Sequence, residues 1–139
     1  MKGFFPACFL GIVAFWLGGT NAKAGEEDAV NRVIQQQLEA FRKNDFGTAY
    51  GFALSGIRKQ FTQAEFEKMV RGNFAPMVKP GVVEFGGTKI AEGKAAVQLT
   101  LTAADGTKSA YRYFLEKENG EWHIAAVVPI EIEPQETLV

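Results

Sequence analysis

The stretch KSAYRYFLEKENGEWHIAAVV, residues 108–128, predicts a β-hairpin and decides the fold class of the chain. Apolar and polar side chains alternate on both sides of Asn119-Gly120, a dipeptide typical of two-residue type I′ turns. Strands that leave such a turn gather their apolar side chains on one face. The turn predicts four facing pairs: Leu115 with Ile124, Tyr113 with Ala126, Tyr111 with Val128, and Lys117 with Trp122.

Two further turn signals extend this hairpin into a meander. Glu92-Gly93 and Asp105-Gly106 separate runs of β-branched and aromatic residues that repeat with a period of two. Short connections of this kind join neighbouring antiparallel strands, so the pattern predicts one four-stranded antiparallel sheet. The predicted strands cover residues 82–90, 95–103, 108–117 and 121–132.

The loop lengths follow from the apolar pattern, because a slip of one residue turns every side chain of a strand to the opposite face. A three-residue loop at Asp105-Gly106, with Gly106 as a bulge, brings the apolar residues of two strands together. We expect the same loop length at Glu92-Gly93 and a further bulge at Gly86-Gly87. The expected pairs are Leu99–Tyr111, Val97–Tyr113, Phe85–Leu99 and Val83–Leu101.

One face of the predicted sheet is apolar and the other is mostly polar. The outer face carries three apolar residues, Phe114, Ala125 and Val127, which would suit a modest homodimer interface. A sheet with one apolar face has to be covered by other elements. The predicted inner face consists of Val83, Phe85, Val97, Leu99, Leu101, Tyr111, Tyr113, Leu115, Trp122, Ile124, Ala126 and Val128.

Amphipathic helices that precede the strands provide this cover. Residues 26–44 carry apolar side chains at the helical period, and Gln37 lies within their apolar stripe. Asp45 is the expected N-cap of a second helix, whose apolar stripe runs from Phe46 to Ile57.

A third helix begins at the capping-box pair Thr62 and Glu65, and we expect it to end at Pro76 and Pro80. The sequence therefore predicts an α+β fold, with three N-terminal helices packed on one face of a curved four-stranded antiparallel meander sheet.

The first 24 residues predict a secretory signal peptide rather than a part of this fold. Lys2 precedes the uncharged run FFPACFLGIVAFWLGG, residues 4–19, and the small-residue pattern Ala22-Lys23-Ala24 follows. The run is shorter than the ~20 residues that a membrane-spanning helix needs. We expect cleavage after Ala24, which leaves residues 25–139 as one domain in the periplasm or outside the cell, without a membrane anchor.

Composition argues against several classes of partner and site. The formal net charge of −1 is too small for a nucleic-acid-binding protein, which needs a basic face. The only cysteine, Cys8, lies in the predicted signal peptide, so we expect no disulfide framework. No cluster of His, Asp or Glu has metal-ligand spacing, and no glycine motif has phosphate-loop spacing. We therefore expect no metal and no cofactor.

Three stretches, with the spacing between them, resemble one bacterial family. They are VIQQQLEAFRKNDFGTAYGFA (33–53), FEKMVRGNFAPMVKPGVVEFG (66–86) and NGEWHI (119–124). They resemble domain of unknown function 4864, within the nuclear transport factor 2-like (cystatin-like) superfamily. The resemblance implies a conical fold of helices on a curved sheet, often export, and no established activity. His123 departs from the Arg or Lys expected at its position, which argues against a catalytic His123.

Four neutral polar residues are the candidates for a binding site. Gln37 and Tyr50 lie in the apolar stripes of two helices, and Tyr111 and Tyr113 lie on the inner face of the sheet. Inside the cone these groups would contact a small apolar ligand. The alternative is that each satisfies a local hydrogen bond in a solid core. His123 is expected on the outer face, diagonal to or beside Glu116, as a solvated cross-strand pair.

Three functions are compatible with these residues. The first is a non-catalytic domain that binds a small apolar ligand or a protein partner. The second is an enzyme of the isomerase or lyase kind, which would need a carboxylate or histidine in the cone. The third is an adaptor that dimerises through the outer face. The inner face and the helix stripes carry no acid or base, so we identify no catalytic residue and favour the first function.

Overall fold

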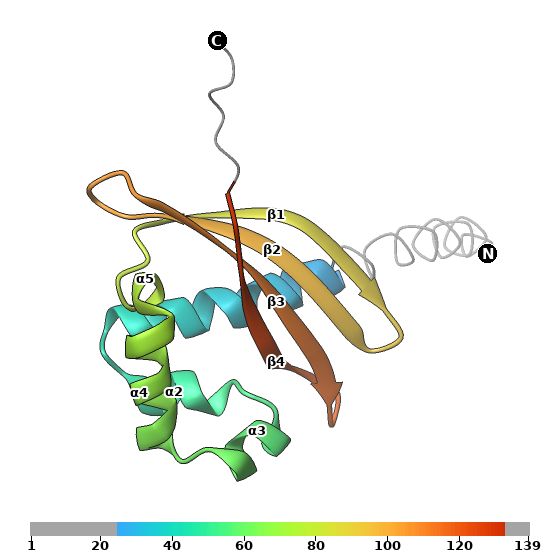
Figure 1. Cartoon of the computed structure of the whole chain (residues 1–139). Coiled ribbons are helices and arrows are strands. Elements are labelled where there is room, and N and C mark those ends of the chain that lie inside the picture. Colours follow the sequence, from blue (N-terminus) through green and yellow to red (C-terminus); the bar gives the residue numbers. More distant parts are fainter. Residues whose placement is uncertain (1–24, 133–139) are drawn as a thin grey trace, which may run out of the picture.

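The computed structural model describes residues 25–132, which form helices first and then one sheet (Figure 1). The predicted signal peptide and residues 133–139 lie outside these residues. A helix over residues 25–42 comes first. The elements that follow are α2 (Phe46–Gly51), α3 (Ser55–Gln60), α4 (Gln63–Asn73), α5 (Ala75–Val78), β1 (Val82–Ala91), β2 (Lys94–Thr102), β3 (Lys108–Glu118) and β4 (Glu121–Ile130).

The strands form the predicted antiparallel sheet in the order β1-β2-β3-β4. The N-terminal helix runs across one face of this curved sheet (Figure 1). It buries Val30, Ile34, Leu38 and Phe41 against the sheet, together with Gln37. The α+β prediction, with helices before a four-stranded meander, is confirmed.

The second predicted helix is interrupted, and this corrects the sequence analysis. Asp45 caps α2 as expected, because its Oδ1 accepts a hydrogen bond from the Thr48 N–H at 3.1 Å. The chain then leaves the helix and pairs with β4. The Leu54 N–H donates to the Ile124 carbonyl at 2.9 Å, and the Ile124 N–H donates to the Phe52 carbonyl at 2.7 Å. This bridge uses the unpaired edge of β4 and separates α2 from α3.

The third predicted helix is also split into two helices, α4 and α5. Thr62 and Glu65 form the predicted capping box of α4. The helix ends at Asn73, before either proline, and Pro76 lies in the first turn of the short helix α5. Proline has no N–H to donate and its φ is fixed at a helical value, so it is tolerated in a first turn. Pro76 therefore begins a new helix, and the prediction that it ends the third helix is wrong.

The β1–β2 hairpin forms the predicted residue pairs, although its turn is shorter than predicted. Ala91 pairs with Lys94, so Glu92-Gly93 is a two-residue turn with positive φ at both positions, and the expected three-residue loop is wrong. The predicted bulge lies between Phe85 and Thr88 and adds one residue to β1. The bulge compensates for the shorter turn, and Phe85 still faces Leu99.

The β2–β3 connection is the predicted three-residue loop. The Ala103 N–H donates to the Thr107 carbonyl at 2.8 Å, and Gly106 has a φ of 90°. The confirmed pairs include Leu99–Tyr111 and Val97–Tyr113.

The β3–β4 register is correct near the turn and wrong beyond it. Asn119-Gly120 has positive φ at both residues, and Leu115 pairs with Ile124 and Lys117 with Trp122 as predicted. A bulge then makes Tyr113 pair with Val127, and not with Ala126. Tyr111 pairs with Pro129, and not with Val128.

This bulge changes which side chains of β4 face the core. Val127 packs against the core, while Ala126 is exposed and Val128 is 45% exposed. The expectation that Ala126 and Val128 point inward is therefore wrong, and so is the outward placement of Val127. The outer face of β3 and β4 thus carries the apolar side chains of Phe114, Ala126 and Val128.

Candidate functional site

An apolar cavity of about 240 Å³ lies between the helices and β4. The N-terminal helix contributes Gln37 and Phe41 to its wall, and α4 contributes Phe66, Met69 and Val70. Residues 124–127 of β4 close one side. The remaining described lining residues come from the segments around α3 and α5: Ala53, Ile57, Phe61, Phe74 and Met77.

Gln37 is the one polar side chain among the described lining residues, and it is only 4% exposed. Its Nε2 donates to the Ala49 carbonyl at 3.3 Å, and its Oε1 accepts from the Tyr113 hydroxyl at 3.1 Å. A carbonyl can only accept a hydrogen bond, so the NH₂ group must face Ala49. These contacts fix the orientation of the amide and connect three elements at the cavity wall.

The Tyr113 hydroxyl lies behind Gln37 in the fully buried core. Met77 Sδ is 3.7 Å from the same hydroxyl, a weaker acceptor than the amide oxygen. Burial raises the pKa of Tyr113 far above its ordinary value of 10.0, and the neighbouring Tyr111 adds to the effect. Tyr113 therefore stays a neutral donor that holds Gln37 in place.

The structure brings together two of the four predicted site residues, Gln37 and Tyr113. The Tyr50 hydroxyl turns to the end of α3, 2.8 Å from the Arg58 carbonyl and 2.5 Å from the Phe61 carbonyl. The Tyr111 ring packs against Phe74 at 6.0 Å between ring centroids. Neither Tyr50 nor Tyr111 is part of the cavity wall.

Sequence reasoning missed two parts of the wall. The first is the part formed by Ile57 and Phe61 from the segment around α3, which the bridge to β4 holds beside the cavity. The second is Val127, which the β4 bulge turns inward. No local signal identifies this bulge, because Ala125, Ala126 and Val127 suit either face of a sheet.

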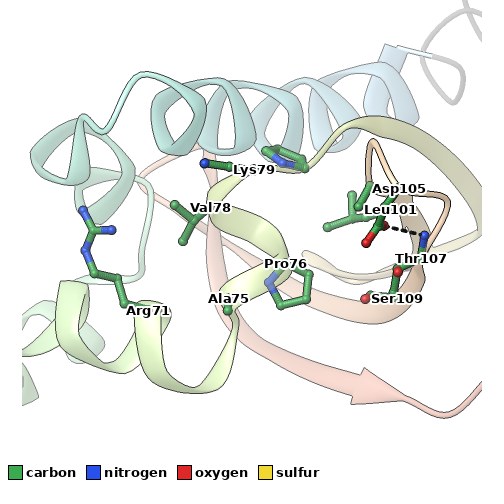
Figure 2. Close-up of a pocket in the computed structure, with 11 residues that line it drawn as sticks. Arg71, Ala75, Pro76, Val78, Lys79, Leu101, Asp105, Thr107 and Ser109 are labelled. Carbon is green, nitrogen blue, oxygen red and sulfur yellow. Dashed lines mark hydrogen bonds between the residues drawn. The ribbon is translucent and has the colours of Figure 1, made fainter.

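A larger groove of about 510 Å³ lies between α5 and the β2–β3 loop (Figure 2). Two of the three charged side chains in its described lining, Arg71 and Asp105, have partners, and Lys79 is the third. Arg71 Nε pairs with Glu67 Oε2 at 2.9 Å, and Asp105 Oδ1 accepts from the Thr107 N–H at 2.9 Å. The groove is more open to water than the cavity that contains Gln37. We therefore take the smaller, more enclosed cavity as the candidate site.

His123 lies on the outer face and pairs with Glu116 across the strands, as predicted. Its closest carboxylate contact is Glu118, with Nδ1 3.9 Å from Oε1. Glu118 also accepts from the Ser55 N–H at 3.1 Å and from the Ser55 hydroxyl. These hydrogen bonds, with smaller effects of His123 and Arg58, lower the pKa of Glu118. The predicted solvated pair is thus a half-buried cluster that anchors the start of α3.

Within residues 25–132, no three side chains of His, Cys, Asp or Glu lie close enough to share a metal ion. No helix in that range is long and apolar enough to cross a membrane.

Comparison with solved structures identifies the class of fold as nuclear transport factor 2-like. An NTF-2-like protein of unknown function from Shewanella oneidensis MR-1 matches with a TM-score of 0.53 and 15% identity, over 75% of this chain and 98% of that protein. A putative NTF2-like transpeptidase from Campylobacter jejuni matches with a TM-score of 0.54 and 16% identity, over 73% of this chain and 97% of that protein.

The particular family is defined by the sequence. The chain belongs to the family of the domain of unknown function DUF4864, whose family model matches residues 23–137. No curated protein matches the chain. The predicted family and superfamily are confirmed, and at these identities the structural neighbours show the fold alone.

Proposed function

We propose that this domain binds a small, largely apolar molecule in the cavity without transforming it. The supporting observation is a cavity of about 240 Å³ whose described lining contains one polar side chain, Gln37. Ligand sites typically combine apolar walls with a few placed polar groups. An engineered apolar cavity of about 150 Å³ binds benzene, so this cavity has room for about ten non-hydrogen atoms.

The composition of the wall favours binding over proton transfer. An isomerase or lyase acting here would need a carboxylate or an imidazole at the cavity. The described lining residues supply neither. Tyr113, the ionisable side chain that contacts Gln37, has a strongly raised pKa and is therefore a poor general base.

We also propose that the domain acts after export, in the periplasm or outside the cell. The support is the uncharged run at residues 4–19, followed by Ala22-Lys23-Ala24. N-terminal sequencing of the exported protein should begin at Gly25. A sequence that still begins at Met1 would contradict this proposal.

Binding can be tested with butylbenzene as the probe. The methyl groups of Met69 and Met77 belong to the cavity wall and report on its contents when labelled for NMR. We expect butylbenzene to shift both methyl signals in a saturable manner. Met69→Trp should fill the cavity and abolish the response of Met77, whereas Phe114→Ala on the outer face should leave it unchanged. The proposed function fails if neither butylbenzene nor the ketone butyrophenone, which is similar in size, gives a saturable response in the folded wild-type domain.

A further inference from the structure

The hydrogen-bonding capacity of Gln37 is only partly used within the protein. Its NH₂ group has two hydrogens, and the structure shows one bond from Nε2 to the Ala49 carbonyl. Its Oε1 receives the Tyr113 hydroxyl. One N–H therefore has no protein partner among the described residues, although the side chain is only 4% exposed.

A buried N–H without a partner is less well tolerated than a carbonyl oxygen that keeps one free lone pair. Gln37 lies in the wall of the cavity, and the other described lining side chains are hydrocarbon or thioether groups. Thioethers are weak acceptors. The group that best satisfies this N–H is an acceptor carried by whatever fills the cavity.

The residues of the cavity wall also determine which ligand charge is favoured. None of the described lining residues is charged, so an ionised ligand would lose its hydration without gaining a counter-ion. Acids and amines are disfavoured for this reason. A neutral carbonyl oxygen needs only the one donor that Gln37 offers.

We infer that the ligand is an uncharged molecule of about ten non-hydrogen atoms with one carbonyl-type acceptor, which receives the free Nε2–H of Gln37. This inference rests on the proposed function, since it concerns the same cavity. It adds the chemical class, a small neutral ketone, ester or similar carbonyl compound, and it names the residue that selects it.

The test compares three probes of similar size: butylbenzene, butyrophenone and 4-phenylbutanoate. Each is titrated into the wild-type domain and into Gln37→Met/Tyr113→Phe, which removes the amide and its hydroxyl partner together. Butyrophenone should lose about tenfold in affinity on this double substitution, the value of one hydrogen bond. Butylbenzene should change less than about twofold, and 4-phenylbutanoate should bind neither protein.

The outcomes separate the two proposals. If neither neutral probe binds the wild type, the proposed function fails. If both bind and the double substitution weakens them equally, or if 4-phenylbutanoate binds as well as butyrophenone, the function stands and the inferred ligand class is wrong.

A second measurement does not depend on the folding of the variant. The carbonyl stretch of isotope-labelled butyrophenone bound to the wild type should lie at lower frequency than in hexane, because the oxygen accepts a hydrogen bond. An unshifted stretch would overturn the contact with Gln37.

Discussion

The Tyr113 hydroxyl donates to Gln37 Oε1 at 3.1 Å and so joins two residues that are 76 positions apart in the chain. Both side chains are buried, one on β3 and one on the N-terminal helix. The bond fixes the helix against the sheet and places the Gln37 amide in the cavity wall. The same contact therefore stabilises the fold and shapes the candidate site.

The first prediction concerns this pair. Gln37→Leu leaves the Tyr113 hydroxyl with only the weak acceptor Met77 Sδ, while the Ala49 carbonyl keeps the Phe52 N–H. This loss should lower the free energy of unfolding by about 1–3 kcal/mol. Tyr113→Phe should cost about 1–2 kcal/mol. In urea denaturation the double variant should cost less than the sum of the two single variants, by about 1 kcal/mol. Strict additivity would show that the two groups are not coupled.

The second prediction concerns the part of the cavity wall that Ile57 and Phe61 form. The Tyr50 hydroxyl holds the end of α3 through the carbonyls of Arg58 and Phe61, and α3 has no buried residue of its own. Tyr50→Phe should cost about 1 kcal/mol and accelerate amide hydrogen exchange in residues 55–61. Ile57 and Phe61 belong to the wall, so exchange of bound butylbenzene should also accelerate. Unchanged amide exchange in this segment would contradict the role of Tyr50.

The third prediction concerns Gly81, at the entry to β1. Its φ is 67°, and a Cβ at this position would lie 2.1 Å from the Thr102 carbonyl oxygen. Gly81→Ala should therefore destabilise the domain by more than about 2 kcal/mol, because strain and a backbone clash act together. Gly106→Ala is the matched control, since Gly106 has a φ of 90° but open space around it. It should cost about 1 kcal/mol, and equal losses would refute the clash.

The fourth prediction concerns the stability of the domain at acidic pH. Hydrogen bonds from Ser55 lower the pKa of Glu118 below its ordinary value of 4.5. A carboxylate with a lowered pKa in the folded state stabilises the fold above its unfolded-state pKa, and this contribution is lost as the pH falls through the folded-state value. Protonation of Glu118 should thus weaken the anchor of α3 below about pH 4.5. His123 and Arg58 are the other charged groups that act on this carboxylate.

The measurement is the free energy of unfolding between about pH 7 and about pH 3. The wild type should lose more stability over this range than Glu118→Gln, which cannot titrate. Equal losses in the two proteins would show that the Ser55–Glu118 contact does not depend on the charge.

The sequence by itself determined the order of elements, the caps and the registers close to the turns. These features depend on local chemistry. Asn119-Gly120 accepts positive φ at both residues, and Thr62 with Glu65 satisfies the free amides of a helix start. The period of the apolar residues then reports which side of each element is buried, so the inner-face positions of Leu99, Tyr113 and Leu115 were predictable.

Only the tertiary structure decided where the regular pattern is broken and which polar groups meet. The second helix stops where Ala53 meets the edge of β4, and β4 changes face at a bulge beside Ala125. Neither event has a local signal, because small residues suit several conformations and the competing hydrogen bonds come from distant parts of the chain. Gln37 meets Tyr113 rather than Tyr50 for the same reason. Periodicity assigns a side chain to a face, while its partner depends on how the faces are packed together.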